Sequence, residues 1–360
     1  MSKIVIFLLL GGIVGCMSCC DRNEEEYYIT EDFIQRWLQN KNGTIATYIK
    51  ENDEVDSEQV KGREALSETL GLWMIYAIEK EDEKLFNKAY KQFNKYFLES
   101  NGLIYWKINQ EGENEVIANA LIDDYRILDA LIAAYDKWGT KKFMESAQLI
   151  SGYLVNYNMK NGYFTDFHEQ EYQTTSENIT LSYIDPEIMN VAADRGISDK
   201  KITEATINVL KASPLRNGFY PKSFNVNKDT YSFDENINMV DQSITAYHQA
   251  KRGNISEEFL EFIKAEINDT GTIFGIYNID TKKPIVDYES PAVYGFLILY
   301  CLEINEKELA NDIYKRMKNF QILDKKNKYY GGYSVYNNDT HVFDNIVPLL
   351  AEQQLNKSKK

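Results

Sequence analysis

A short glycine-containing turn returns at nearly even intervals along the 360-residue chain and divides most of it into six similar units. Its glycines are Gly43, Gly102, Gly162, Gly218, Gly271 and Gly331, which lie 53 to 60 residues apart, and asparagine precedes the first four of them. Asn-Gly pairs form turns because both residues tolerate positive φ. A spacing this regular indicates a repeat architecture and strongly limits the folds that the chain can adopt.

Helical periodicity dominates between the turns, and strand patterns are sparse. Within residues 63–80, for example, Leu66, Leu70 and Met74 share one face of the expected helix. A second helix is expected around residues 86–97. Further helices are predicted at about residues 117–137, 140–157, 184–194, 199–212, 240–251, 255–267, 289–303, 305–319 and 342–353. Each unit therefore consists of one turn and two helices.

Six near-equal helical hairpins predict an all-α fold, specifically an (α/α)6 toroid in which inner and outer helices alternate. The loops that precede the inner helices would meet at one end of the ring and line a substrate cleft. We expect residues 29–360 to form this single domain. An open solenoid, or an unrelated helical bundle with coincidental turns, is the alternative.

The first residues have the pattern of a secretory signal. One lysine, Lys3, precedes an apolar run over residues 4–10, and a small residue, Gly15, precedes Cys16. The run is too short for a stable membrane span. Residues 13–16 resemble the bacterial lipobox, in which the cysteine receives a diacylglycerol. We therefore predict a lipoprotein signal peptide over residues 1–15, lipidation of Cys16 and a tether over residues 16–28. Ordinary signal cleavage is the alternative.

This anchor predicts a protein on the extracellular face of the cell membrane, where it would meet extracellular polymer. The formal net charge is -15, which disfavours binding to nucleic acid because a phosphate backbone requires clustered cations. The three histidines form no His-x-x-x-His pair, and no Cys-x-x-Cys pair is able to hold zinc. No glycine-rich phosphate loop precedes a helix either. We expect neither a metal nor a cofactor, and the sequence says nothing about oligomeric state.

Carboxylates recur at one position of the repeat. Glu68, Asp124, Asp185 and Asp241 follow the glycine of their unit by 22 to 25 residues, where an inner helix should begin. In the last two units the acids come earlier, at Asp287, Glu289 and Asp344. Glu68 and Asp124 also share helix faces with apolar residues. A carboxylate in that setting is paired, neutral or functional, because burying a lone charge is costly.

Such a set of carboxylates suits glycoside hydrolysis. One protonated carboxylic acid donates to the leaving oxygen, and a second carboxylate removes a proton from the attacking water. Inversion requires the two groups roughly 6.5–9.5 Å apart, which acids on opposite inner helices can span. The structural alternative is that Glu68 or Asp124 pairs with Arg63 or Arg126.

Three stretches resemble glycoside hydrolase family 8. Residues 67–74 (SETLGLWM) are similar to its Ser-Glu-Gly motif, and residues 119–124 (NALIDD) with residues 131–139 (LIAAYDKWG) resemble its Ala-Thr-Asp-x-Asp segment and downstream Trp-Gly. Residues 181–186 (LSYIDP) resemble its Ser-Tyr-Phe-x-Pro segment. The resemblance implies an inverting (α/α)6 hydrolase acting on β-1,4-linked polysaccharide, with Glu68 as the general acid.

The second motif departs from the family, because Ile122 replaces its first aspartate. The resemblance therefore assigns the sugar-holding role to Asp124, with Asp123 beside it and Tyr183 as a further contact. The family's Tyr-Asp-Ala-x-Arg segment, which holds the base, is not intact, and an ungapped alignment puts Asn238 at its position. Because Asp241 lies at the position of the repeat where carboxylates recur, we favour it as the base, with Asp234 as the second choice.

Aromatic residues near the repeated turns are candidates for stacking on sugar rings. They are Trp106, Tyr163, Phe164, Phe219, Tyr220 and Tyr333.

The resulting hypothesis is a lipid-anchored, inverting endo-glycosidase. With its lipobox the chain resembles a branch of the family found with Gram-positive exopolysaccharide clusters, which implies a β-linked biofilm polymer as substrate. An acidic protein favours a neutral or cationic polymer, since a polyanion would be repelled. A non-catalytic polysaccharide-binding lipoprotein and a lyase on the same toroid are the alternatives.

Overall fold

A computed structural model of the chain describes residues 28–52, 59–114 and 116–359. The predicted signal peptide, Cys16 and all of the predicted tether except Tyr28 lie outside the described residues. Tyr28 itself is buried and packs edge-on against Tyr76 at a ring distance of 6.3 Å. The folded body therefore includes this last residue of the predicted tether.

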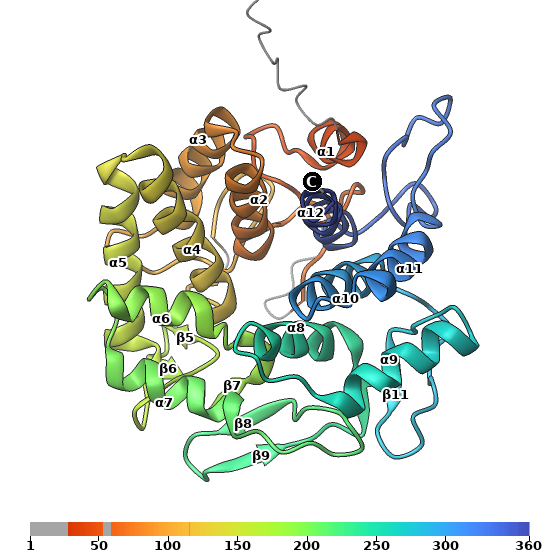
Figure 1. The fold of residues 1–360 in the computed structure, drawn as a ribbon. Helices are drawn as coiled ribbons and strands as arrows, with labels where there is room; N and C mark the ends of the chain where they lie inside the picture. Colours follow the sequence, from red (N-terminus) through yellow and green to blue (C-terminus); the bar gives the residue numbers. More distant parts are fainter. Residues whose placement is uncertain (1–27, 53–58, 115, 360) are drawn as a thin grey trace, which may run out of the picture.

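Twelve helices in the described part of the chain form two concentric rings (Figure 1). The inner ring consists of α2 (Ser67–Glu79), α4 (Leu121–Trp138), α6 (Pro186–Asp194), α8 (Met239–Ala250), α10 (Pro291–Glu303) and α12 (Phe343–Lys357). The outer ring consists of α1 (Ile29–Phe33) with η1 (Ile34–Leu38), α3 (Glu83–Gln92) with η2 (Phe93–Phe97), α5 (Lys141–Tyr157), α7 (Lys200–Lys211), α9 (Glu257–Asp269) and α11 (Lys307–Lys318). Helix α12 packs against α2 and closes the inner ring. The predicted toroid is thus confirmed, with one helical segment at residues 29–38 that the periodicity did not reveal.

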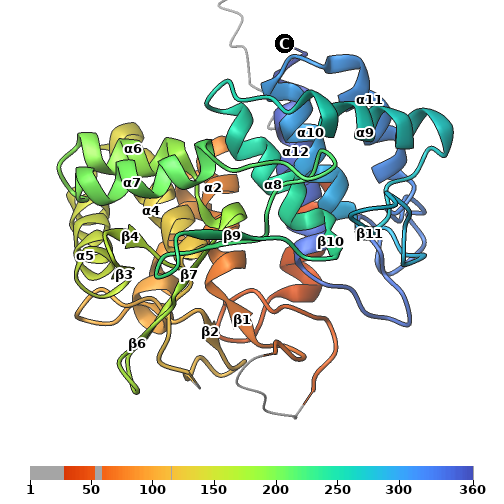
Figure 2. The same ribbon diagram turned by 90° about the horizontal axis from the view of Figure 1, so that it is seen from below.

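Short antiparallel strands tie the loops together at one end of the ring. Four sheets have two strands each: β1 (Ala65–Leu66) with β2 (Lys107–Ile108), β3 (Met159–Lys160) with β4 (Tyr163–Phe164), β5 (His168–Glu169) with β6 (Thr174–Thr175), and β10 (Asn236–Asn238) with β11 (Ile276–Asn278). The fifth sheet has three strands, in which β8 (Ser223–Asn225) lies between β7 (Asn178–Thr180) and β9 (Thr230–Ser232). Three of these sheets join loops of successive units, since β1–β2, β7–β8 and β10–β11 each span two units. All lie in connections that run from an outer to an inner helix, so they gather where the inner helices begin (Figure 2). We call this end the loop end and the opposite end the far end.

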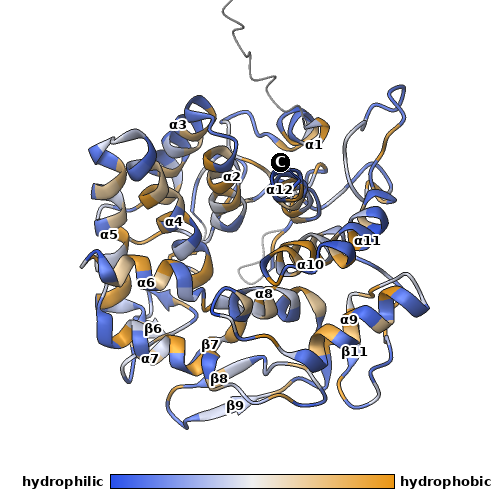
Figure 3. Ribbon diagram, viewed as in Figure 1, coloured by the Kyte–Doolittle hydropathy of each residue, from blue (hydrophilic) through white to orange (hydrophobic). Residues whose placement is uncertain are grey.

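The inner helices form the core because both of their faces are covered. Helix α10 is apolar around its whole circumference, and α8, α11 and α12 all pack on it. Outer helices such as α3 and α11 instead bury one side only, and their other side is hydrophilic (Figure 3). This contrast follows from their position between the inner ring and solvent.

The six repeated glycines all have positive φ, between +70° and +98°, as the turn prediction requires. Two of them are also fixed by close packing. A Cβ on Gly102 would lie 2.3 Å from the carbonyl oxygen of Leu149, and one on Gly331 would lie 2.3 Å from that of Ile29. The turns therefore set how closely successive units pack as well as where the chain reverses.

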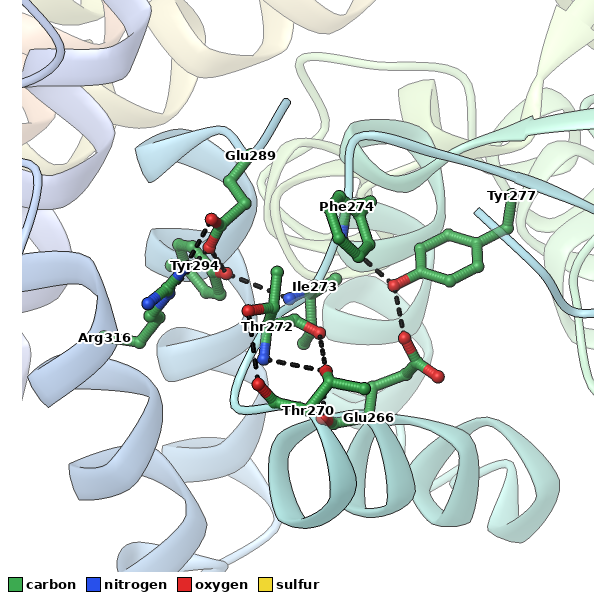
Figure 4. A network of polar contacts seen from close by, with 9 residues as sticks. All are labelled: Glu266, Thr270, Thr272, Ile273, Phe274, Tyr277, Glu289, Tyr294 and Arg316. Atoms are coloured by element: carbon green, nitrogen blue, oxygen red, sulfur yellow. Dashed lines mark hydrogen bonds and ion pairs between the residues drawn. The ribbon is translucent and has the colours of Figure 1, made fainter. Parts of the chain in front are cut away.

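Tyrosine hydroxyls hold the fifth turn in place (Figure 4). The hydroxyl of Tyr294 accepts a hydrogen bond from the Ile273 amide at 2.9 Å and donates to Glu289, which Arg316 also contacts through its Nε at 2.7 Å. Tyr277 similarly accepts from a loop amide and donates to a carboxylate of α9 at 2.6 Å. Glu289, one of the acids that come earlier in the last two units of the repeat, thus has a structural role.

We predict that Gly295→Ala destabilises the protein, because the added Cβ would lie 2.8 Å from Val347 Cγ1 where α10 meets α12. Overpacking of this kind costs about 1–3 kcal/mol. The matched control is Gly152→Ala in α5, where a Cβ meets nothing within 4 Å and should stabilise the helix by about 0.5–1 kcal/mol. Thermal unfolding followed by circular dichroism would measure both, and equal shifts in the two variants would contradict the close contact of the inner helices.

Candidate active site

Acidic side chains gather at the loop end because the inner helices that carry them, α2, α4 and α8, begin there. Glu68 is the second residue of α2, Asp123 the third of α4 and Asp241 the third of α8. A helix N-terminus carries free N–H groups and partial positive charge, which favour carboxylates in the first turn. The sequence therefore places several acids at one end of the ring.

One cluster joins α2 to α4. The hydroxyl of Ser67 donates to Asp123 Oδ2 at 2.9 Å, while the Arg126 guanidinium lies 3.4 Å from both Glu68 Oε1 and Asp123 Oδ1. The Glu68 side chain is 26% exposed and the Asp123 side chain 7%. Glu68 is thus the more accessible acid, and Arg126 pairs with it as the structural alternative anticipated.

Burial, with a smaller contribution from the Glu68 charge, raises the pKa of Asp123 to about 7, although Arg126 and Ser67 both act in the opposite direction. Asp123 is therefore neutral over the lower part of the physiological pH range. In that form it is a hydrogen-bond donor as well as an acceptor.

Asp241 approaches the same region from α8. Ser182 in η3 (Leu181–Tyr183) donates to its Oδ1 at 2.9 Å, and Lys222 pairs with its Oδ2. Tyr183, next to Ser182, connects the two groups of acids. Burial first, and then the charges of Asp123, Asp166, Glu68 and Asp241, raise the pKa of its phenol. The Tyr183 hydroxyl therefore lies within the electrostatic field of carboxylates from both sides of the ring.

Two residues of this region were not singled out from the sequence. Asp166 accepts from the Thr180 amide at 2.6 Å and from its hydroxyl at 3.0 Å, and burial raises its pKa to about 6. His341 packs edge-on against Tyr48 at 4.9 Å, and burial lowers its pKa although Asp344 and Glu68 act against this. Neither residue lies at the position of the repeat where carboxylates recur. Only the fold of the loops brings them close to the acids described above.

The sugar-holding role assigned to Asp124 requires a correction. Asp124 is 1% exposed and accepts a hydrogen bond from Asn119 Nδ2 at 2.5 Å. Burial raises its pKa well above the usual range. Adjacent helix residues point about 100° apart, so only Asp123 joins Glu68 and Arg126. Asp124 belongs to the internal packing of α4.

The other candidate residues at or near this position of the repeat have different surroundings. Asp234 is exposed between β9 and β10 and has no hydrogen bond or ion pair with another described residue. Asn238 caps α8 by accepting from the Val240 amide at 2.8 Å. Asp344 accepts from Ser290 at 2.6 Å and from the Ala292 amide at 3.1 Å, and so caps α10.

Four of the six predicted stacking residues are wrong. Phe164, Phe219, Tyr220 and Tyr333 are at most 5% exposed and lie in the hydrophobic core, so no sugar can reach their faces. The aromatic that follows a turn packs between the inner and outer helices instead. Tyr163 is half-buried and packs on Phe224 at 5.7 Å. Trp106 is half-buried, and its carbonyl accepts from the Ser67 amide at 3.0 Å, which places it next to Glu68.

Other aromatics on the loops that precede inner helices are exposed and were missed. They are Phe167, Tyr172, Tyr288 and Tyr336, with exposures between 40% and 77%. No sequence signal separates them from the buried set, because the two sets have similar neighbours.

The structure describes no helix that is long and apolar enough to cross a membrane. Within residues 28–52, 59–114 and 116–359, no group of three or more His, Cys, Asp or Glu side chains is arranged to hold a metal ion.

Comparison with known proteins agrees with this geometry. Residues 29–252 match the family model described as glycosyl hydrolases family 8. "Putative lipoprotein YdaJ" of Bacillus subtilis is 37% identical over 98% of this chain and 96% of its own length. A solved structure described as a novel alpha-amylase from Clostridium perfringens has a TM-score of 0.81 and 26% identity over 91% of this chain and 96% of that one. Endoglucanase Cel10 of Klebsiella pneumoniae, a family 8 glycosyl hydrolase, shares the fold with a TM-score of 0.62 and 15% identity over 90% and 98% of the two chains.

We predict opposite shifts of the Asp123 pKa in two variants. Glu68→Gln removes a neighbouring negative charge and should lower the pKa of Asp123 below about 7, whereas Arg126→Met removes a positive charge and should raise it. Titration of the aspartate carboxyl carbons by NMR would measure both shifts. Shifts of the same sign would contradict the arrangement of these three side chains.

Proposed function

The chain belongs to glycoside hydrolase family 8, and from this premise we propose that it is an inverting endo-glycosidase, lipid-anchored on the extracellular face of the membrane, that hydrolyses a β-linked exopolysaccharide. Glu68 is the general acid and Asp241 the general base. The observation that carries the proposal is the convergence of these two partly exposed carboxylates at the loop end, from helices on opposite sides of the inner ring (Figure 1).

The position of α2 and α8 supports inversion rather than retention. Two inner helices lie between them in either direction around a closed ring of six, so their first turns face each other across the axis. Retention needs carboxylates only about 5–5.5 Å apart, whereas inversion leaves room for a water molecule between the sugar and the base. Acids on opposite helices fit the wider arrangement.

The reaction then proceeds by paired proton transfers. Glu68 donates its proton to the glycosidic oxygen, and Asp241 removes a proton from the water that attacks the anomeric carbon on the other face of the sugar. Bound to Ser182 and Lys222, the Asp241 carboxylate has a fixed orientation and retains lone pairs for this water.

Asp123 takes the sugar-holding role in this proposal. It adjoins Glu68 and is neutral below a pH of about 7, so it can donate a hydrogen bond to a sugar hydroxyl. The Tyr183 phenol, which lies near both acids, is the second contact. Trp106 beside Ser67 supplies the apolar face on which a sugar ring can stack.

Two observations support the lipid anchor. The N-terminal residues resemble a lipobox with Cys16 as the lipidated residue, and the Bacillus subtilis relative carries the word lipoprotein in its name. A lipid on Cys16 would hold the hydrolase close to the cell surface, where exported polysaccharide emerges.

A second candidate substrate is an α-linked glucan. The similarity to the Clostridium perfringens alpha-amylase covers 91% of this chain, and the proposed acid–base pair does not by itself select the anomeric configuration of the substrate. Starch is therefore a necessary comparison substrate, and binding without cleavage of any polymer would favour the non-catalytic alternative.

We predict that the purified protein releases new reducing ends from the extracellular polysaccharide of its own host, and that Glu68→Gln abolishes this activity. Loss of a general acid costs about 10²–10⁴-fold in rate. Circular dichroism should show unchanged helix content, because Gln keeps the size of Glu. Undiminished activity in Glu68→Gln would refute the mechanism, and reducing ends from starch alone would replace the β-linked substrate with an α-linked one.

A matched pair of variants identifies the base. We predict that Asp241→Asn lowers the rate by about 10²–10⁴-fold, whereas Asp234→Asn, in an exposed residue that contacts none of the gathered acids, stays within about twofold of the unmodified protein. Initial rates of reducing-end formation would measure both. The reverse order would make Asp234 the base.

A further inference from the structure

A second polar region lies at the far end of the ring, away from Glu68 and Asp241. A cavity of about 340 Å³ occupies the axis there and is lined by residues from each inner helix. Its volume falls at the lower end of the range of small-molecule sites. The lining residues Glu187 and Glu79 have side chains that are 65% and 34% exposed, so the cavity opens to solvent at this end.

The cavity wall is mainly apolar. Its apolar side chains include Ile75, Ile78, Ile122, Phe296, Leu299 and Leu350. Arg126 and Tyr183 also line it, and both belong to the group of residues around Glu68. The cavity therefore reaches along the axis as far as the side chains that support the loop end.

Most charged groups in the cavity have partners. Asp185 Oδ2 lies 3.1 Å from Lys251 Nζ and 3.4 Å from His248 Nε2, and Lys251 also pairs with Glu187 at 3.0 Å. Glu79 pairs with Lys357. These contacts leave few cations free to neutralise a further acid.

Asp129 is the exception. It lines the cavity and is accessible to water, yet it has no hydrogen bond or ion pair with another described residue. Arg126, one turn earlier on α4, is engaged with Glu68 and Asp123 instead. Desolvation by the surrounding cavity walls, together with the charges of Asp185, Glu187 and Glu79, raises the pKa of this water-accessible carboxyl, and Lys251 only partly offsets the effect.

A second unpartnered group belongs to a residue that lines the same cavity. The Nδ1 atom of His248 is buried without a hydrogen-bond partner, and the His248 side chain is only 7% exposed. Four acids and two permanent cations, Arg126 and Lys251, line the cavity, which leaves an excess of negative charge. The C-terminal ends of the inner helices add partial negative charge at this end.

We propose that the axial cavity is a second binding site, distinct from the loop end, and that it takes a small organic cation whose ammonium group pairs with Asp129 and whose apolar body contacts the aliphatic wall. An organic cation fits better than a metal ion, because the described residues hold no group of three metal-ligating side chains. This site does not depend on the proposed function, since none of its argument uses the hydrolysis of a polysaccharide.

The probe is benzylammonium, compared with benzyl alcohol as the neutral molecule of similar shape. Isothermal titration of the intact protein at about pH 8, where Asp129 is largely ionised, should give saturable binding of benzylammonium. A hydrogen bond to a charged group is worth about 1.5–3 kcal/mol, so benzyl alcohol should bind at least about tenfold more weakly.

Three variants locate the site. Asp129→Asn should weaken benzylammonium binding at least about tenfold, whereas Asp312→Asn, in an exposed acid on the outer helix α11, should leave it unchanged. Asp241→Asn, in an acid of the loop end that does not line the cavity, should also leave it unchanged. Asp129→Asn removes an acid without a partner, so the variant should fold, which its thermal unfolding would verify.

Several outcomes would overturn the proposal. Equal binding of benzylammonium and benzyl alcohol would exclude a role for the charge, and undiminished binding by Asp129→Asn would exclude this residue. Loss of binding in Asp241→Asn with retention in Asp129→Asn would move the site to the loop end. Absence of any binding would mean that the cavity holds only water.

Discussion

The common direction of the inner helices is the constraint on which both ends of this molecule depend. All but α6 begin at the loop end, so most of their free N–H groups and partial positive charge are concentrated there, and their partial negative charge is concentrated at the far end. Carboxylates at the first turns of α2, α4 and α8 gain from this field. The same field at the far end disfavours unpaired acids and favours cations.

Two side chains connect the environments at the two ends. Arg126 contacts Glu68 and Asp123 at the loop end and also lines the axial cavity. Tyr183 lies in the field of the loop-end carboxylates and borders the same cavity. The barrier between the acids and the cavity is therefore built partly from polar side chains, and the charge of Arg126 is shared between two sets of acids. Acids enclosed by this ring compete for few cations, which explains why the buried Asp123 and the water-accessible Asp129 both have raised pKa values.

The sequence predicted the architecture well because its turns and its apolar residues recur at regular intervals. The spacing of the turns gave six hairpins, and helical periodicity placed α5, α7 and α10 within two residues of their observed ends. The repeat also placed Glu68 and Asp241 correctly in the first turns of inner helices, since that position is one that the repeat defines. It could not choose between Asp123 and Asp124, because one residue of rotation on α4 decides which carboxylate meets Arg126. It assigned Phe219 and Tyr333 to the wrong environment, because a loop aromatic can point to the core or to solvent with the same neighbours in sequence.

The third unit departs from the repeat, and this departure contributes to both ends. Asp185 has the same spacing from its glycine as Asp241, yet it caps α6 and pairs with Lys251 at the far end. The reason is that η3 occupies the place where an inner helix would begin, which puts Ser182 against Asp241, while α6 starts later and is only 9 residues long.

A full-length inner helix in this unit would extend through the position of η3 and remove the turn that carries Ser182 and Tyr183 to the other acids. The same late start brings the first turn of α6, with Asp185 and Glu187, beside the end of α8 at the mouth of the cavity. One interruption of the repeat thus supplies polar groups to the loop end and charged groups to the far end, which a strictly regular toroid would not provide.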